Sequence, residues 1–417
     1  MSASPLAGLR VVDLSRHLPG PLVGHLLADL GARVLKVEEP LQGDPVRLAP
    51  PLVRGTGALA ALLLSGVESV ALDLKRPAGR EVLERLLEDA DVLLESFRPG
   101  TLARLGFPPE ELRERHPRLV ICSLSGWGVD GPWATRAGHD LTYQAQAGTL
   151  AATATMPAYP GADLVGAWCA LASILAALVE RGRGDGKEGG EGGGAWIDAS
   201  LYDAALHTNL TAWAEAGAEE RGADRGASRG VGEPQGLTGA LPCYNLYATA
   251  DGGRLAVAAL EEPFWRRFCE AAGHPELAGI QYRASAEARA RVAEVVAERT
   301  LDEWRGALAG LDLPVEPVLS AAEAAGHPQA RARDLLRRAG DGLYRLAFPA
   351  RFDGARPRAG ERFPELGEAT ERVVGEVGGE PAALSPGRRR RAGVGRRPDP
   401  VGRLRTALAR WWIGRRR

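Results

Sequence analysis

The chain has 417 residues, which is too long for one ordinary domain and suits two or three. Hydrophobic residues make up 45% and charged residues 25%, a balance typical of a soluble globular protein, which excludes a disordered, fibrous or disulfide-scaffold protein. The net charge of −1 hides an asymmetry, because residues 387–417 hold twelve Arg and one Asp, a net of +11, which leaves −12 for residues 1–386.

The first 130 residues alternate between strand-like and helix-like patterns. Short runs rich in β-branched residues predict buried strands at 9–14, 33–38, 69–74, 91–95 and 119–123. Between them, Pro21–Leu30 and Gly79–Glu88 have helical spacing, so the alternation indicates βαβ units and a parallel sheet covered on both faces. The loop LPGP at 18–21 opens the first helix and suits a phosphate, although the segment contains neither GxGxxG nor GxxxxGK[ST].

The middle of the chain predicts one long apolar helix. Residues 163–181 carry no charge between Asp163 and Glu180, and these bounding charges favour burial within the protein over a place in a membrane. The charged, Gly-rich segment 181–194 predicts a surface loop. The sequence AWIDASLYDAAL at 195–206 then predicts a strand that runs into a helix.

The second half predicts a smaller domain with a β-hairpin. Two strands, Tyr244–Thr249 and Leu255–Leu260, flank the turn ADGG, helices are expected across 264–310, and the chain is expected to return to the first domain near Glu368–Val377. We therefore predict a large domain from 1–213 and 326–384, a polar, Gly-rich linker at 214–236, a small domain at 237–325, and a disordered basic tail at 385–417.

The cysteines and the N-terminus indicate the compartment. The four cysteines lie far apart, with no CxxC pair and no His at metal-ligand spacing, so we expect neither a metal site nor a disulfide framework: Cys122, Cys169, Cys243 and Cys269. The N-terminus lacks a basic region followed by an apolar one, and no uncharged apolar run reaches the ~18 residues that span a bilayer. These features predict a cytoplasmic protein.

Three positions could carry chemistry. Asp163 begins the long apolar helix, where a carboxylate either caps the helix or acts as a nucleophile or base at the mouth of a pocket. The pair His139–Asp140 follows a Trp- and Gly-rich loop after the fifth strand, where ligand-binding loops of parallel sheets lie, although a lone His is more often structural. Glu261 ends a strand and would equally serve as a solvated carboxylate.

Several motifs resemble the class III CoA-transferase family of the CaiB/BaiF type, which includes the α-methylacyl-CoA racemases. They are PLAGLRVVDLSRHLPGPLVGHLLADLGARVLKVEEP, LDLKRPAG, ESFRPGTLARLGF and GHDLTY, in that order, within a resemblance that covers residues 5 to about 378. The resemblance implies an α/β fold with a large domain on a six-stranded parallel sheet with flanking helices, built from both chain ends, and a smaller α+β domain. It also implies an interlocked homodimer whose active sites lie between the large domain of one subunit and the small domain of the other.

The resemblance implies catalytic roles for His139, Asp140, Asp163 and Glu261. In the transferases, the residue matching Asp163 attacks the acyl-CoA thioester to form a mixed anhydride. In the racemases, residues matching His139 and Asp163 move the α-proton of an intact 2-methylacyl-CoA thioester from one face to the other, and the residue matching Glu261 orients the His. Backbone N–H groups near Asp163 are candidate donors to the enolate oxygen.

We expect racemase chemistry, with acyl transfer as the alternative. His139 stands where transferases tend to have an aromatic residue, and ALEEPF around Glu261 is similar to the A-[IL]-E-P-x-F of the racemases, although Glu262 displaces the Pro by one place. The segment QAQAG at 144–148 is more similar to the transferases. A third interpretation is a non-catalytic acyl-CoA binder.

The resemblance also implies the CoA contacts, with CoA as part of the substrate and no other cofactor. The matching positions are Leu72, Asp73, Leu74, Lys75, Ser96, Phe97, Arg98, Arg104, Gly138 and Tyr143. The cations suit the CoA phosphates, and Phe97 suits stacking on adenine or pantetheine. Glu39 stands where the family commonly has a basic residue. The expected partners are an acyl-CoA thioester and a second copy of the chain, with no nucleic acid.

The basic tail is expected to be either a disordered Arg-rich extension or a segment that makes a weak contact with anionic membrane surfaces. Its last segment, GRLRTALARWWIGRRR, has Leu and Trp near one helical face and Arg opposite, and each basic residue near an anionic leaflet contributes about 1 kcal/mol, less at high salt. We expect a truncation after Leu384 to keep full turnover and to lose salt-sensitive binding to anionic vesicles. If the full-length protein does not bind such vesicles at low salt, the tail is only an extension without membrane affinity.

Overall fold

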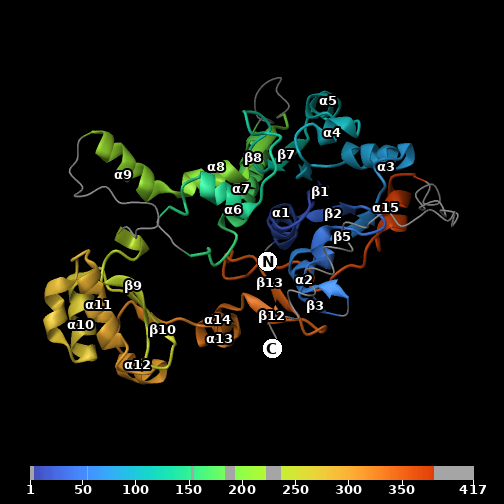
Figure 1. Cartoon of the computed structure of the whole chain (residues 1–417). Coiled ribbons are helices and arrows are strands. Elements are labelled where there is room, and N and C mark those ends of the chain that lie inside the picture. The colour runs from blue at the N-terminus through green and yellow to red at the C-terminus, as the bar shows by residue number, and fades with distance from the viewer. Residues whose placement is uncertain (1–3, 54, 152–154, 184–192, 222–235, 380–417) are drawn as a thin grey trace, which may run out of the picture. The chain divides into compact units, whose positions relative to one another are not determined.

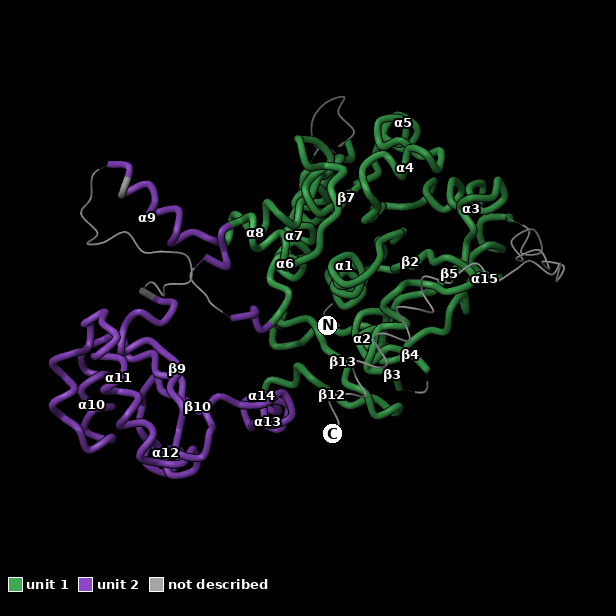
Figure 2. Tube along the Cα trace, in the orientation of Figure 1, with its two compact units in different colours: residues 1–147, 159–208, 333–417 green, residues 148–158, 209–332 purple. Residues whose placement is uncertain are grey.

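The computed structural model describes residues 4–53, 55–151, 155–183, 193–221 and 236–379. The chain forms two compact units, of which unit 1 comprises 1–147, 159–208 and 333–417, and unit 2 comprises 148–158 and 209–332 (Figure 2). Unit 2 therefore includes residues 148–158, 209–213 and 326–332, which the predicted ranges assigned to the large domain. The predicted basic tail, residues 184–192 of the Gly-rich loop and residues 222–235 of the linker lie outside the described residues.

Unit 1 is built on a six-stranded sheet whose neighbouring strands are all parallel (Figure 1). Its strands are β1 (Arg10–Asp13), β2 (Arg33–Glu38), β5 (Glu68–Ala71), β6 (Val92–Glu95), β7 (Val120–Ser125) and β8 (Trp196–Ser200). They lie in the order β5-β2-β1-β6-β7-β8, a doubly wound arrangement in which the strand order reverses between β1 and β6. The five strands predicted in the first 130 residues are confirmed, with small shifts at their ends, as is the strand before residue 201.

Helices cover both faces of this sheet, as predicted. One hydrophobic cluster includes buried residues of α1 (Pro19–Asp29), α2 (Ala58–Leu63), α7 (Gly161–Arg183) and α8 (Leu201–Thr208). The other cluster includes residues of α3 (Pro77–Glu88), α4 (Thr101–Arg104), α5 (Pro109–Arg115) and α15 (Thr370–Glu376). In α3 the four apolar positions that predicted the helix, at 82, 83, 86 and 87, are all buried. Their spacing therefore places one face of α3 on the sheet.

The long helix α7 packs against the core along one face. Ala167, Leu171 and Ile174 are buried in the cluster that α7 shares with α1 and α8. Among the described residues, α7 is the one helix long and apolar enough to cross a membrane, a test that core helices of soluble proteins also pass. Trp168 and Val179 on its other side are 39% and 53% exposed. The predicted burial of this helix is therefore confirmed for one face and wrong for the other.

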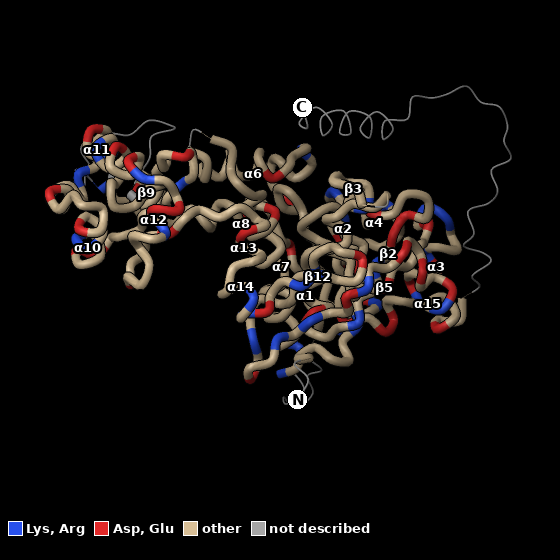
Figure 3. The backbone as a smooth tube through the Cα atoms, turned by 90° about the horizontal axis from the view of Figure 1, so that it is seen from below, with Lys and Arg blue, Asp and Glu red and all other residues tan. Residues whose placement is uncertain are grey.

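The C-terminal part of the described chain returns to unit 1, as predicted. It first forms the hairpin of β12 (Leu336–Arg338) and β13 (Tyr344–Leu346). Helix α15 then lies beside β5, where the Ala369 N–H donates to the Ser69 carbonyl at 2.9 Å. Arg372 pairs with Glu68 at 2.7 Å. Basic and acidic residues are interspersed along the chain in both units (Figure 3).

Unit 2 contains the predicted hairpin and an aromatic core. Strands β9 (Tyr244–Ala248), β10 (Arg254–Ala258) and β11 (Val315–Pro317) form an antiparallel sheet in the order β11-β10-β9. Helices α10 (Glu262–Ala272), α11 (Ala286–Val296) and α12 (Leu301–Leu308) pack on it. The ring of Phe268 lies 5.4 Å from Trp265 and 5.9 Å from Trp304 between centroids, and all three side chains are buried.

The linker predicted at 214–236 is wrong over its first residues. Helix α9 (Leu210–Glu220) occupies this stretch. Its sequence LTAWAEAGAEE is rich in Ala and Glu, which are strong helix formers, and their combined propensity outweighs the cost of the one glycine, Gly217. Glycine content is therefore a poor guide to a linker where alanine surrounds it.

Candidate active site

A cavity of about 250 Å³ opens at the carboxyl ends of β1, β2, β5 and β6. Doubly wound folds bind their ligands at the carboxyl ends of the strands, beside the point where the strand order reverses, and the cavity lies at this position. Five of the residues that the family resemblance assigned to CoA line it: Leu72, Asp73, Leu74, Lys75 and Phe97. The cavity thus brings together the segments that follow β5 and β6.

Three further predicted residues lie close to this cavity or to Tyr143. Ser96 accepts a hydrogen bond from the backbone N–H of Arg16 at 2.8 Å, and Arg104 donates to Thr101 at 2.7 Å. Both Arg16 and Thr101 line the cavity. Arg98 is exposed, and its charge partly offsets the burial that raises the pKa of the Tyr143 hydroxyl.

The sequence did not single out several residues that line the cavity. Ser15, Arg16 and Asp44 contribute to its wall, and Arg16 adds a cation to it. The available signal was the segment LSRHLPGP, whose glycine and prolines mark a loop after the first strand. Glu39, which stands where the family commonly has a basic residue, also lines the cavity. Its carboxylate accepts hydrogen bonds from the N–H groups of Leu41 and Gln42.

A second group of residues gathers at the start of α6 (Asp140–Gln146) and α7. The Asp140 carboxylate accepts the backbone N–H of Asp163 at 3.1 Å through Oδ1 and the side-chain amide of Gln144 at 2.7 Å through Oδ2. Burial, together with the charge of Asp140, raises the pKa of Asp163 to about 7. Asp163 is therefore poised between its acid and base forms at neutral pH. Its own N–H is engaged by Asp140, so it is not a free donor to an enolate oxygen.

Tyr143 and Gly138 pack tightly beside these carboxylates. A Cβ on Gly138 would lie 2.5 Å from the Tyr143 ring, so only glycine allows this approach. Burial, and next the charge of Asp163, raises the pKa of the Tyr143 hydroxyl to about 12, which keeps it a proton donor. Trp127 meets the Tyr143 ring edge to face at 4.9 Å. This packing fixes the backbone just before His139.

His139 is exposed and precedes the first residue of α6. The Thr142 hydroxyl accepts its backbone N–H at 3.0 Å and donates to its carbonyl at 2.7 Å. Burial is the main cause that lowers the pKa of a second histidine, His17. Asp44 opposes this shift, and the nearby Arg16 and His139 add to it. His17 has a φ of 72°, an unusual conformation for a non-glycine residue, and its N–H donates to Asp44 at 3.1 Å. The sequence did not predict a role for His17.

Comparison with known proteins identifies the family. The model of CoA-transferase family III matches residues 6–370. The chain belongs to this family. It is 32% identical over 388 residues to the α-methylacyl-CoA racemase of Homo sapiens, a match that covers 89% of this chain and 93% of the racemase. It is 31% identical over 368 residues to the acetyl-CoA:oxalate CoA-transferase of Acetobacter aceti, which covers 84% of this chain and 90% of the transferase.

Solved structures give the same result. The crystal structure of a CaiB/BaiF family protein from Brucella suis matches with a TM-score of 0.77 and 29% identity, over 90% of this chain and all of that one. The predicted membership of the CaiB/BaiF family and the α/β fold with a six-stranded parallel sheet are confirmed. Because the similar proteins are racemases and CoA-transferases, the chain is a family III enzyme of one of these two types.

Glu261, the last of the four residues that the family resemblance assigned to catalysis, lies in unit 2. It immediately precedes α10, and its carbonyl accepts the N–H groups of Phe264 and Trp265, both at 3.1 Å. Its carboxylate is exposed and makes no hydrogen bond to the described residues. Glu261 is therefore available to a partner group, and its pairing with His139 stays a prediction.

The raised pKa of Asp163 predicts how stability depends on pH. Because this carboxyl holds its proton up to about pH 7 in the folded state and only to about pH 4 when unfolded, the fold loses stability as pH rises through that window. We expect Asp163→Asn to raise the free energy of unfolding by about 2 kcal/mol at pH 8 relative to its effect at pH 4.5, after discounting for partial exposure. Urea unfolding at the two pH values measures this. An equal effect at both would show that Asp163 ionises normally.

Proposed function

We propose that this family III enzyme epimerises the α-carbon of a 2-methylacyl-CoA thioester by 1,1-proton transfer between His139 and Asp163. The observation that carries the proposal is the environment of Asp163, whose pKa of about 7 lets it both donate and accept a proton at neutral pH. A nucleophile that forms an anhydride uses only the ionised form of the carboxyl, whereas proton transfer in both directions uses both forms. The similarity to the human racemase supports the same activity.

The arrangement of α6 and α7 supports two proton-transfer groups at one site. Asp140 follows His139 directly and binds the N–H of Asp163, so one carboxylate joins the two candidate groups. In one direction neutral His139 would take the α-proton and protonated Asp163 would supply the new one. In the other direction the roles reverse. Two groups are needed because a single base would return the proton to the same face.

The CoA part of the substrate would occupy the cavity at the sheet edge. Arg16 and Lys75 line it and would meet the phosphates, and Phe97 would contact adenine or pantetheine. The enolate oxygen needs a donor other than the Asp163 N–H, for example another first-turn N–H of α6 or α7. We propose no cofactor beyond CoA itself, and we place the enzyme in the cytoplasm, where acyl-CoA thioesters are available as substrates.

A second candidate is CoA transfer between carboxylic acids through an anhydride on Asp163. The similarity to the acetyl-CoA:oxalate CoA-transferase favours it. Asp163 is only partly buried, so a thioester carbonyl could reach its carboxylate. The two activities differ in what happens to the thioester, which stays intact in the racemase and breaks in the transferase.

Deuterium exchange separates the two activities. In deuterated water the enzyme is expected to label the α-carbon of 2-methylacyl-CoA from either epimer, without an acceptor acid, as measured by mass spectrometry. His139→Asn and Asp163→Asn should each lose epimerisation and keep exchange with only one epimer, because one base remains. Movement of acyl groups to a free carboxylate with no α-label would instead establish the transferase.

We also propose that the enzyme is a homodimer of interlocked chains. The exposed apolar side of α7, with Trp168, Ala172 and Val179 spaced along one face, supports a protein partner there. Because linked chains separate only on unfolding, tagged and untagged folded protein should form no hybrid within hours of mixing. Hybrids that appear rapidly, or a folded monomer in sedimentation, would contradict the interlocked arrangement.

A further inference from the structure

We propose that Gln144 is a positioning residue of the active site, which holds the Asp140 carboxylate against the backbone N–H of Asp163. Gln144 is only 7% exposed, and its side-chain amide donates to Asp140 Oδ2 at 2.7 Å. The other oxygen of the same carboxylate accepts the Asp163 N–H at 3.1 Å. With each oxygen bound to a different donor, the carboxylate has one preferred orientation.

The surroundings of Gln144 explain why its own position is fixed. A Cβ on Gly161, the first residue of α7, would lie 3.3 Å from Gln144 Oε1 and 3.5 Å from Nε2, so the amide packs directly on the start of that helix. Gln144 lies four residues after Asp140, one turn along α6, which brings the two side chains onto the same face. Gln144 therefore bridges the beginnings of α6 and α7.

This bridge places a negative charge where it controls the proton on Asp163. The charged or titratable groups found here among the described residues are Asp140 and Tyr143 on α6, His139 directly before that helix, and Arg98 after β6, which acts on Tyr143. Of these, Asp140 is the charge that acts on Asp163, and it opposes ionisation. By holding Asp140 in place, Gln144 keeps Asp163 available as a proton donor. The inference rests on the proposed function only in assigning a catalytic use to that proton.

A stability cycle tests the positioning role without any substrate. The melting temperature is measured with Asp163 present and with Asp163→Asn, at pH 5 and pH 8, in three proteins: the natural chain, Gln144→Leu and Gln146→Leu. The gain is the rise in melting temperature that Asp163→Asn causes. Gln146 is exposed on the same helix and serves as the matched control. The gain in melting temperature from Asp163→Asn at pH 8 relative to pH 5 should become smaller with Gln144→Leu, because Asp140 is then free to turn away and only the effect of burial, the larger cause, remains. It should not change with Gln146→Leu.

Equal gains in all three backgrounds would overturn the proposal. If Gln144→Leu does not fold, Gln144→Asn replaces it, since the shorter amide stays polar but falls short of Asp140. The same reduction of the gain is expected for Gln144→Asn, and an unreduced gain overturns the proposal.

Catalysis supplies the second readout. In the α-proton exchange assay, the apparent pKa for Asp163 acting as an acid should fall by about one unit with Gln144→Leu. With Asp140→Asn present, Gln144→Leu should cause no further shift, because the charge that it positions is gone. A loss of rate that is equal at every pH would show Gln144 to be merely structural. A coupled stability cycle in an enzyme that exchanges no α-proton would support the positioning role and count against the proposed function.

Discussion

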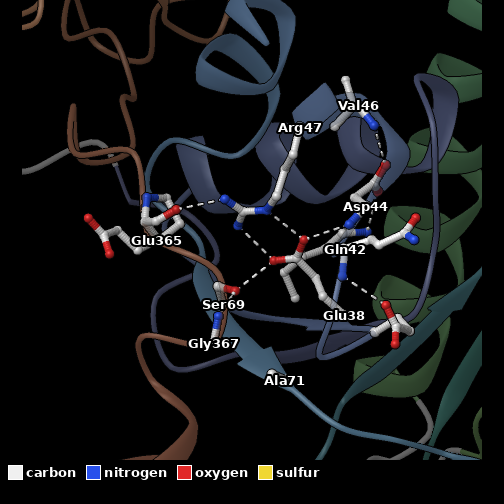
Figure 4. A network of polar contacts seen from close by, with 12 residues as sticks. Glu38, Gln42, Asp44, Val46, Arg47, Ser69, Ala71, Glu365 and Gly367 are labelled. Carbon is white, nitrogen blue, oxygen red and sulfur yellow. Dashed lines mark hydrogen bonds and ion pairs between the residues drawn. The ribbon is translucent and has the colours of Figure 1, made fainter. Parts of the chain in front are cut away.

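The buried carboxylate of Glu38 is the interaction on which the arrangement of unit 1 depends (Figure 4). Its two oxygens accept from Arg47, both at 2.7 Å, and one of them also accepts from the Ser69 hydroxyl at 2.6 Å. Arg47 donates in turn to the Pro364 carbonyl at 2.9 Å, and Ser69 accepts the Gly367 N–H at 2.8 Å. One carboxylate thus joins β2, β5, the short 3-10 helix Pro45–Leu48 and the returning C-terminal segment.

A second ionic centre on the same strand supports the cavity. Lys36 lies two residues before Glu38, so both side chains project from the same face of β2. Lys36 is fully buried between Asp13 at 3.3 Å and Asp44 at 3.4 Å, and it donates to the Ser15 carbonyl. Because removing one partner of a buried pair costs roughly 3–5 kcal/mol, such pairs allow few alternative positions for the loops that carry them. These loops form the cavity wall through Ser15 and Asp44.

The surroundings of Asp163 on α7 affect its ionisation in the opposite direction to the surroundings of Glu38. Although burial raises the pKa of Glu38, the hydrogen bonds and charge of Arg47 together with the hydrogen bonds from Ser69 and the Asp44 N–H outweigh it and keep that pKa below its ordinary value. Asp163 instead has a second carboxylate, Asp140, beside it, and no cation among the described residues offsets the effect of burial. The first arrangement stabilises the charged form of an acid and serves the fold. The second destabilises it and makes the proton available, which is the property that acid–base chemistry requires.

The order of strands and helices in unit 1 was predictable because it depends on local patterns. Buried parallel strands are short apolar runs, α3 shows its helical period directly, and the hairpin in unit 2 surrounds an evident turn. The motifs that resemble the family are also local, which is why membership and the segments lining the cavity could be predicted before any coordinates. Helix α9 was missed because its glycine was given more weight than its alanines.

The contacts of the candidate active site were decided by the tertiary structure alone. The bond between Asp163 and Asp140 joins residues 23 apart, and the bond between His17 and Asp44 joins residues 27 apart. No periodicity or motif specifies which oxygen meets which N–H, since that depends on how α6, α7 and the loops after β1 and β2 pack. The sequence by itself determined the strands of the large sheet, the family and the residue types at the site. Packing alone determined the protonation of Asp163 and the role of Gln144, because both depend on groups that only the folded chain brings within hydrogen-bond distance.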